Sequence, residues 1–402
     1  MLVAGIIAEY NPFHRGHAWQ IAQTRRLLGE DCAVVCIMSG HWAQGGDCAV
    51  TDKWTRAGLA LSGGADLVLE LPVVWAASSA ERFARGAVAH LAATGVVNYL
   101  CFGSEEGAIA PLQAAAHCLD SADYPAALRG LLKQGLSFPA ARQAAVVRLR
   151  GDAGACLSTP NNTLGVEYLR ALRYVPCRIE PITVRRRGCG HHPGGTGDAI
   201  APEEGFRSAT EIRRMLRGED WAAAEACLLP GAAELLRAAG RADLHRCERA
   251  ILARLRAMTA EDFSRLPDAG GREGLDLRLA DCARRACTAE EFLTLAKTRR
   301  YPLTRLRRLM VSAFLGLTED DRPAGARYLR VLGSNERGRG VLRQMKERAT
   351  LPVITKPAHG KALEETARRL LAIEARATDL FELCLPAPRP CGRDWITTPV
   401  IR

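Results

Sequence analysis

Residues 2–17 read LVAGIIAEYNPFHRGH, an apolar run followed by a polar loop with two histidines. The run Leu2–Ile7 has no polar alternation, which is typical of a strand buried on both faces. Residues 17–28 then carry apolar side chains at helical spacing and end at Gly29, so they predict an amphipathic helix. His14 and His17 therefore lie on a strand-to-helix turn, where free backbone N–H groups and the helix dipole favour an anion.

Two interpretations of this histidine pair are open. The pair could be a helix cap and a solvated side chain, since H-x-x-H spacing is common. Alternatively, Gly16 lets the backbone approach a phosphate, and the two imidazoles donate to the oxygens of a transferring phosphoryl group.

Four further strand-like runs alternate with helical patterns in the first half of the chain. The runs are residues 33–39, 66–72, 99–104 and 178–186, and helices are predicted over 51–61 and 79–94. Ser78 and Glu81 are spaced as a capping box for the second of these helices, and Gly95 ends it. This alternation predicts an α/β fold, a Rossmann-like parallel sheet that binds ligands beyond the carboxyl ends of its strands.

Composition describes a globular protein long enough for two domains. The 402 residues are 48% hydrophobic and 25% charged, and no apolar run reaches membrane-spanning length. The first residues lead straight into a strand without a signal-peptide pattern, so we expect a cytoplasmic protein without membrane contact. The 14 cysteines form no C-x-x-C pair, which favours reduced, buried thiols and no metal site.

Charge is unequal along the chain. Residues 219–402 carry 33 Lys and Arg against 25 Asp and Glu, whereas residues 1–218 carry 22 against 19. We expect a catalytic domain over 1–218, with inserted short helices at about 107–160, and a mainly helical basic domain over 219–402. Near residues 327–356 the pattern suggests one further small βαβ unit. The basic half indicates either a polyanionic partner or simple solubility.

The segment AKTRRYPLTRLRRL at 296–309 concentrates the positive charge around Tyr301. Cations interleaved with an aromatic residue suit single-stranded or loop RNA, although a solvated helix face is the alternative. The candidate RNA-binding residues are Lys297, Arg299, Arg300, Arg307 and Arg308.

Several longer motifs occur in a characteristic order. They are AEYNPFHRGH (8–17), MSGHWAQ (38–44), FGSEEG (102–107), PNNTLGVEYLRAL (160–172) and SATEIRR (208–214). The H-x-G-H and SATEIRR motifs resemble the nucleotidylyltransferase superfamily, and the whole order is similar to the bacterial tRNA(Met) cytidine acetate ligases. The resemblance implies that ATP and Mg²⁺ activate acetate as acetyl-adenylate. The acetyl group then passes to N4 of the wobble cytidine of elongator tRNA(Met).

The resemblance also implies a set of site residues. His14 and His17 would be catalytic by donating to the phosphates. The residues implied to bind ATP are Ile7, Ala8, Glu9, Tyr10, Asn11, Pro12, Phe13, His14, Gly16, His17, Gly103, Asn162, Arg186, Arg187, Ser208, Thr210 and Arg213.

Structural alternatives exist for several of these residues. Ser208 with Glu211 is itself a capping box, and Asn162 could cap the following helix. Gly103 could be an ordinary turn glycine, and of the three arginines at 185–187 the family pattern favours Arg186, with Arg187 second.

One departure from the family concerns the loop after MSG, where Gln44-Gly45-Gly46 replaces the usual Gln-Arg-Gly. Lys53 or Arg56 could compensate, and Lys53 could itself reach a phosphate or be solvated. His191 and His192 are weaker candidates.

Two other functions compete with the ligase. One is an adenylyltransferase acting on a small phosphate ester, and the other is a catalytically inactive RNA-binding protein. The basic second half weighs against the former, and the intact His14, Gly16 and His17 weigh against the latter.

Overall fold

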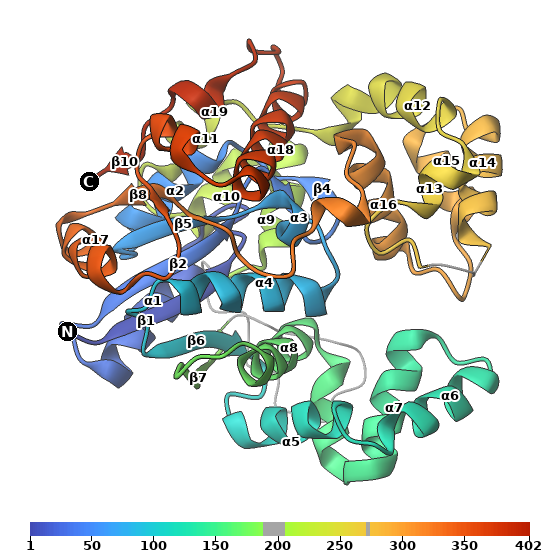
Figure 1. Ribbon diagram of the computed structural model, residues 1–402, viewed down its shortest axis with the longest axis horizontal. Coiled ribbons are helices and arrows are strands. Elements are labelled where there is room, and N and C mark those ends of the chain that lie inside the picture. The colour runs from blue at the N-terminus through green and yellow to red at the C-terminus, as the bar shows by residue number, and fades with distance from the viewer. Residues whose placement is uncertain (188–205, 271–273) are drawn as a thin grey trace.

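The computed structural model describes residues 1–187, 206–270 and 274–402, and its centre is a sheet with helices on both faces (Figure 1). Five mutually parallel strands form most of this sheet in the order β5-β2-β1-β6-β7, with β7 at one edge. They are β1 (Val3–Ala8), β2 (Ala33–Ser39), β5 (Leu67–Leu71), β6 (Tyr99–Ser104) and β7 (Glu180–Arg185). Each strand lies within one of the strand-like runs predicted from the sequence, and the predicted α/β fold class is confirmed.

Alternate side chains of the central strands enter two separate apolar cores. In β2, Val35 and Ile37 belong to one core, and Val34 and Cys36 belong to the other. The first core is covered by helices that include α4 (Ala80–Ala93) and α8 (Pro160–Tyr174), and the second by α1 (Arg15–Leu28) and α2 (Lys53–Ser62). Because both faces of β1, β2 and β5 are buried, these strands read as nearly continuous apolar runs rather than alternating ones.

The three helices predicted in the first part of the chain are present as α1, α2 and α4. Asp52 caps α2, because its Oδ1 accepts the N–H of Thr55 at 2.8 Å. The predicted Ser78–Glu81 capping box is wrong, since Ser79 occupies the N-cap position of α4. The hydroxyl of Ser78 instead donates to the carbonyl of Trp75 at 2.6 Å, which closes the short helix α3 (Val73–Ala76).

Residues between β6 and β7 form the helices that the sequence predicts as an insertion. They are α5 (Ile109–Leu119), α6 (Tyr124–Lys133), α7 (Phe138–Arg150) and the 3₁₀ turn η1 (Gly151–Ser158), after which α8 returns to the sheet.

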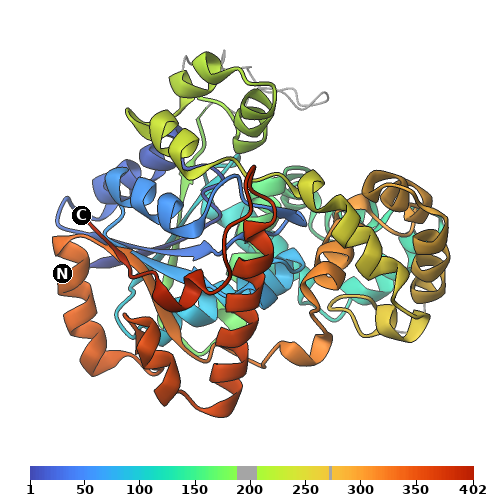
Figure 2. The same ribbon diagram turned by 90° about the horizontal axis from the view of Figure 1, so that it is seen from above.

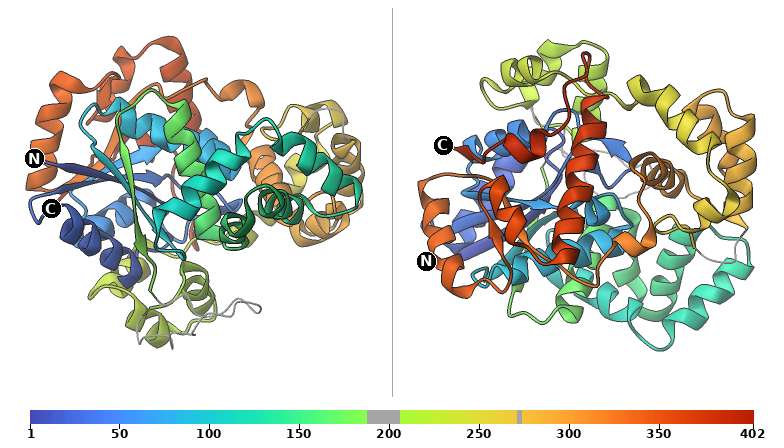
Figure 3. Two further views of the ribbon diagram at one scale, coloured as in Figure 1. Left: turned by 90° about the horizontal axis from the view of Figure 1, so that it is seen from below. Right: turned by 45° about the horizontal axis from the view of Figure 1, so that its top comes forward.

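The second half begins as a series of helices. In chain order these are α9 (Ala209–Arg217), α10 (Trp221–Cys227), α11 (Ala232–Ala239), η2 (Leu244–Cys247), α12 (Glu248–Arg256), α13 (Ala260–Ser264), α14 (Leu275–Arg285), α15 (Ala289–Ala296), α16 (Leu303–Leu315) and η3 (Glu319–Asp321). Helices α12–α16 and the inserted α5–α7 both project from the side opposite the N-terminus (Figures 1 and 3). Helices α9–α11 lie together at a different edge of the molecule (Figure 2).

The last part of the chain returns to the sheet, which the predicted division at residue 218 does not capture. β8 (Leu329–Ser334) pairs antiparallel with β5, and β10 (Val400–Ile401) pairs with β8. β8, α17 (Glu336–Arg348) and β9 (Val353–Ile354) form the predicted βαβ unit, but as part of the main sheet. The remaining elements are η4 (Pro357–Ala362), α18 (Glu365–Glu382) and α19 (Arg393–Ile396).

Two predictions from composition concern membranes and thiols. No helix within the described residues is long and apolar enough to cross a membrane. The cysteines of the described residues are free thiols and most are buried, and no group of metal-ligating side chains is found among those residues.

Candidate nucleotide site

The loop between β1 and α1 is held in a fixed shape by contacts from distant segments. Tyr10 has a left-handed backbone with φ of +47°, and its ring packs edge-on against Phe13 in the second core. The side-chain oxygen of Asn11 accepts the N–H of Val50 at 2.7 Å. Glu9 accepts the N–H of Gln44 at 2.6 Å, which ties this loop to the turn after β2. The histidines that follow are therefore presented from a rigid support.

His14 and His17 fix each other at the start of α1. Nδ1 of His14 accepts the N–H of Gly16 at 3.0 Å, and Nδ1 of His17 accepts the N–H of His14 at 3.3 Å. The two rings stack with centroids 3.8 Å apart. Because each Nδ1 is an acceptor, each neutral ring carries its proton on Nε2. Helix capping and phosphate contact are thus compatible, since capping uses one ring nitrogen and leaves an Nε2–H donor on each ring.

Both imidazoles are held in the neutral state. Burial, with Arg186 and Arg213 nearby, lowers the pKa of His14 to about 3. Burial and the neighbouring His14 lower the pKa of His17 well below its usual value. At neutral pH these rings act as hydrogen-bond donors rather than as cations.

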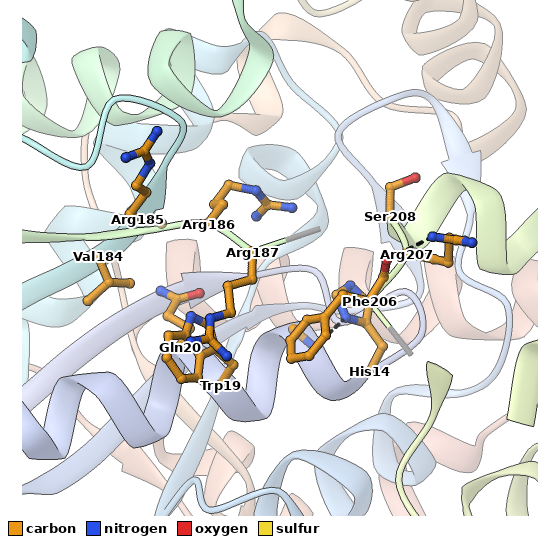
Figure 4. Close-up of a pocket in the computed structure, with 12 residues that line it drawn as sticks. His14, Trp19, Gln20, Val184, Arg185, Arg186, Arg187, Phe206, Arg207 and Ser208 are labelled. Carbon is orange, nitrogen blue, oxygen red and sulfur yellow. Dashed lines mark hydrogen bonds between the residues drawn. The ribbon is translucent and has the colours of Figure 1, made fainter. Parts of the chain in front are cut away.

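A cleft of about 420 Å³, counting space open to solvent, lies beside His14 (Figure 4). Its walls come from the start of α1, the carboxyl ends of β6 and β7, and the residues before α9. It is lined by His14, Gly16, Trp19, Gln20, Gly103, Val184, Arg185, Arg186, Arg187, Phe206, Arg207 and Ser208. This is the sheet edge at which the sequence predicts ligand binding.

The cleft is rich in guanidinium groups, and no acidic residue of the described chain lines it. Arg187 lies over the ring of Trp19, with its Cζ 3.9 Å from the centroid. A Cβ at position 103 would lie 3.1 Å from Cγ of Arg186. The absence of a side chain at Gly103 therefore allows the Arg186 side chain to lie against the end of β6. Four arginines around one cleft suit a polyphosphate.

The start of α9 adds a second helix N-terminus. Ser208 and Glu211 form the predicted capping box, with the Ser208 hydroxyl donating to the Glu211 carboxylate at 2.8 Å and accepting its N–H at 3.2 Å. Arg213 donates to the carbonyl of Asn11 at 2.7 Å and to the hydroxyl of Thr210 at 3.1 Å. Arg213 therefore joins α9 to the histidine loop.

Comparison with known proteins agrees with this geometry. Residues 1–393 match the family model described as HIGH Nucleotidyl Transferase. A tRNA(Met) cytidine acetate ligase of Acetivibrio thermocellus is 34% identical, with all of both chains covered. One from Syntrophotalea carbinolica is 37% identical over 96% of this chain and 95% of that one. The chain belongs to the tRNA(Met) cytidine acetate ligase family.

A solved structure of the family is also similar. Thermotoga maritima TmcAL bound with alpha-thio ATP superimposes with a TM-score of 0.90 at 31% identity, covering 100% of this chain and 99% of that one. Its apo form gives the same values.

Several residues that the ligase family pattern assigns to ATP have buried side chains. Ile7, Tyr10, Pro12 and Phe13 are buried, so what they can offer a nucleotide is backbone. His191 and His192 lie outside the described residues.

Asn162 does not cap α8, because Thr159 occupies the N-cap position. Its side-chain oxygen accepts the N–H groups of Glu105 and Glu106 at 2.9 and 3.2 Å. Asn162 therefore shapes the FGSEEG turn after β6, and ATP contact by Asn162 stays a prediction.

The suggested compensation by Lys53 or Arg56 for the missing loop arginine is wrong. Lys53 is fully buried, with its Nζ 2.6 Å from Glu70 and 2.7 Å from Asp394. Arg56 is also fully buried and donates to the carbonyls of Glu9 and Ser39 at 2.7 and 3.0 Å. Arg56 therefore supports the end of β2, and Lys53 joins β5 to the C-terminal part of the chain, so these buried cations are already committed to protein partners rather than to a phosphate.

The basic segment at 296–309 is only partly a surface. Tyr301 is buried, so its ring does not offer the stacking platform that the sequence suggested. Lys297, Arg299, Arg300 and Arg307 are exposed, whereas Arg308 is half-buried and burial lowers its pKa.

Sequence reasoning missed Trp19, Gln20, Phe206 and Arg207 as cleft residues. Trp19 and Gln20 follow Gly16 by three and four positions, so helical spacing could have placed them on the same face. Phe206 and Arg207 precede a cap and carry no such signal.

Proposed function

We propose that this chain activates acetate with ATP and transfers the acetyl group to N4 of the wobble cytidine of elongator tRNA(Met). The observation that carries the proposal is the His14–His17 pair beside the arginine-lined cleft. Neutral donors and cations gathered at one sheet edge suit charge that develops on a phosphate. Membership of the ligase family supports acetate and tRNA as the other substrates.

In the first step a carboxylate oxygen of acetate attacks the α-phosphorus, and the bond to the pyrophosphate oxygen breaks. Negative charge grows on the oxygens that leave and on those around phosphorus. The Nε2–H groups of His14 and His17 donate to these oxygens, and Arg186 and Arg187 neutralise the phosphate tail. Mg²⁺ would enter with the ATP phosphates, which are its usual ligands in such sites, and would neutralise part of the same charge.

In the second step the cytidine N4 amine attacks the acetyl carbonyl, the bond to AMP breaks, and the amine loses a proton. The aromatic amine is a weak nucleophile, so positioning against the activated carbonyl supplies much of the rate. The wobble base lies in an anticodon loop and can be unstacked without opening a stem. A tRNA substrate supports a cytoplasmic location for the reaction.

The decisive experiment supplies labelled acetate, ATP, Mg²⁺ and elongator tRNA(Met) to the purified protein. The label should appear on one cytidine, with AMP released in equal amount. An adenylyltransferase acting on a phosphate ester would leave the tRNA unlabelled, and an inactive RNA-binding protein would release no pyrophosphate. Either result would overturn the proposal.

A further inference from the structure

A second hollow lies between the β3–β4 hairpin and the helices of the second half. Its volume is about 760 Å³, counting space open to solvent. Gly46 and Asp47, from the hairpin of β3 (Trp42–Ala43) and β4 (Asp47–Cys48), form one wall together with Arg217 of α9, and η2, α12, α15 and α16 form the other. Nothing in the acetate-activating chemistry uses this hollow.

The floor of this hollow is apolar, and its rim carries both signs of charge. Ile251, Leu293 and Met310 are buried beneath it. Asp47 and Arg217 form an ion pair of 3.0 Å at its edge and remain substantially exposed. Acidic as well as basic side chains line the rim, so the hollow is unsuited to a phosphate. Such a lining fits a neutral, flat heterocycle with both donors and acceptors on one edge.

The wall formed by the hairpin is rigidly placed. Gly46 has φ of +76°, and a Cβ there would lie 2.5 Å from the backbone nitrogen of Arg308. The hairpin backbone therefore packs directly on α16 at this point. A fixed wall of this kind is what a base-sized site requires.

Two of the helices that line the hollow, α9 and α15, also lead toward the nucleotide site and toward the exposed cations. Arg217 is one helical turn from Arg213, which donates to the carbonyl of Asn11 in the histidine loop, and its ion pair with Asp47 joins α9 to the hairpin. On the opposite side, α15 leads from the hollow to the exposed Lys297 and Arg299. An RNA backbone lying on these cations would bring one base to the hollow.

We infer that this hollow holds the acceptor cytosine after the base has left the stack of the RNA loop. The ring would lie on the apolar floor, with its hydrogen-bonding edge toward Asp47 and Arg217. The Asp47 carboxylate would accept from the N4 amine, and Arg217 would donate to N3 or O2. This inference rests on the proposed function, because it takes cytidine as the acceptor.

The test measures the binding of three anticodon stem-loops to the wild-type protein and to Asp47→Asn. The stem-loops carry cytosine, uridine or no base at the wobble position. Wild type should prefer cytosine over uridine by about tenfold or more, because uridine presents an acceptor where cytosine presents a donor. Asp47→Asn should lose this preference and bind the abasic loop as wild type does. If the substitution weakens all three RNAs by the same factor, the base is not in this hollow and the inference fails.

Two controls keep the result interpretable. Asp281→Asn breaks a comparable exposed pair with Arg285 on α14 and should leave all three affinities unchanged. A thermal unfolding curve of Asp47→Asn, compared with that of the wild type, establishes that the variant is folded. Labelling of tRNA by the wild-type protein is scored separately, so a failed base assignment is distinguishable from a failed ligase assignment.

Discussion

The arginine-lined cleft and the buried Lys53 cluster place similar charged side chains in opposite circumstances. In the cleft, Arg186 and Arg187 border a hollow that no described acidic residue lines. Lys53 instead lies among carboxylates, with Glu70 and Asp394 as direct partners. Arg330 completes this cluster, 2.7 Å from Asp394. Cations on the wall of an open cleft can meet a ligand, whereas cations buried among carboxylates hold the fold together.

Charge balance within the Lys53 cluster supports this view. Two cations meet three carboxyl groups, the third being Glu374, whose Oε2 accepts the N–H of Val73 at 2.6 Å. Burial and the nearby Glu70 raise the pKa of Glu374 well above its usual value, which favours its neutral form and with it a balanced cluster. The cluster joins α2 and β5 to α18 and α19, which are far apart in sequence.

The largest expected effect is on stability, from Lys53→Met. Removing one partner leaves buried carboxylates uncompensated, which costs about 3–5 kcal/mol. Urea unfolding measures this loss, while ATP–pyrophosphate exchange with acetate, below the unfolding transition, should stay near wild type. Lys346→Met, at an exposed position on α17, should change stability by less than about 0.5 kcal/mol. A raised KM for ATP with unchanged stability would show that Lys53 belongs to the nucleotide site instead.

The next effect concerns catalysis. His17→Ala should lower acetyl-adenylate formation by about a hundredfold or more, as when a preorganised donor to a transition state is removed. The exposed His117→Ala on α5 is the matched control and should be unchanged. Full activity in both His14→Ala and His17→Ala would remove the histidines from the mechanism.

A smaller effect is expected on the pH dependence of stability, which depends on two buried neutral histidines. The folded pKa of His14 is about 3 and that of His90, in α4, is about 4. Both lie below the unfolded value of about 6.5, so the unfolded state takes up protons first and stability falls as the pH drops below 6.5. Replacing either histidine with glutamine should reduce the slope of the unfolding free energy against pH by about 1.4 kcal/mol per pH unit, down to pH 5.

Urea unfolding at pH 7.5 and pH 5 checks the slope. Only His14→Gln should also lose adenylate formation, because the Nδ1 of His90 lies against the carbonyl of Gly86 within α4. Unchanged slopes in both variants would contradict the neutral state assigned to these rings.

The smallest effect is expected at the exposed cations. Replacing Lys297, Arg299 and Arg300 with glutamine should weaken tRNA binding several-fold and reduce its salt dependence, by about 0.9 in slope for each phosphate that is no longer neutralised. Acetyl-adenylate formation without tRNA should be unaffected.

The control for this variant removes the same charge elsewhere. Arg339, Arg343 and Lys346 are exposed on α17, on the other side of the molecule from α15 and α16 (Figure 1). Equal losses of tRNA affinity in the two triple variants would mean that net charge, rather than a docking surface, is responsible.

The sequence by itself determined the central strands, the helices between them and the histidine turn. These features depend on neighbours along the chain: apolar runs, helical spacing, and caps such as Ser208 with Glu211. Gly16 could be named because it directly precedes the first predicted helix, whereas Gly103 and Arg186, near the ends of predicted strands, were singled out with the help of the family resemblance.

Only the tertiary structure decided which partners the charged and polar groups have. Lys53 is paired with Asp394, more than 300 positions away, and no local pattern encodes that contact. The same holds for the burial of Tyr301 and for the return of β8 to the sheet beside β5. Whether a side chain is buried or exposed, and which groups it meets, depends on segments that come together only when the chain folds, because charge pairing and desolvation act through space rather than along the sequence.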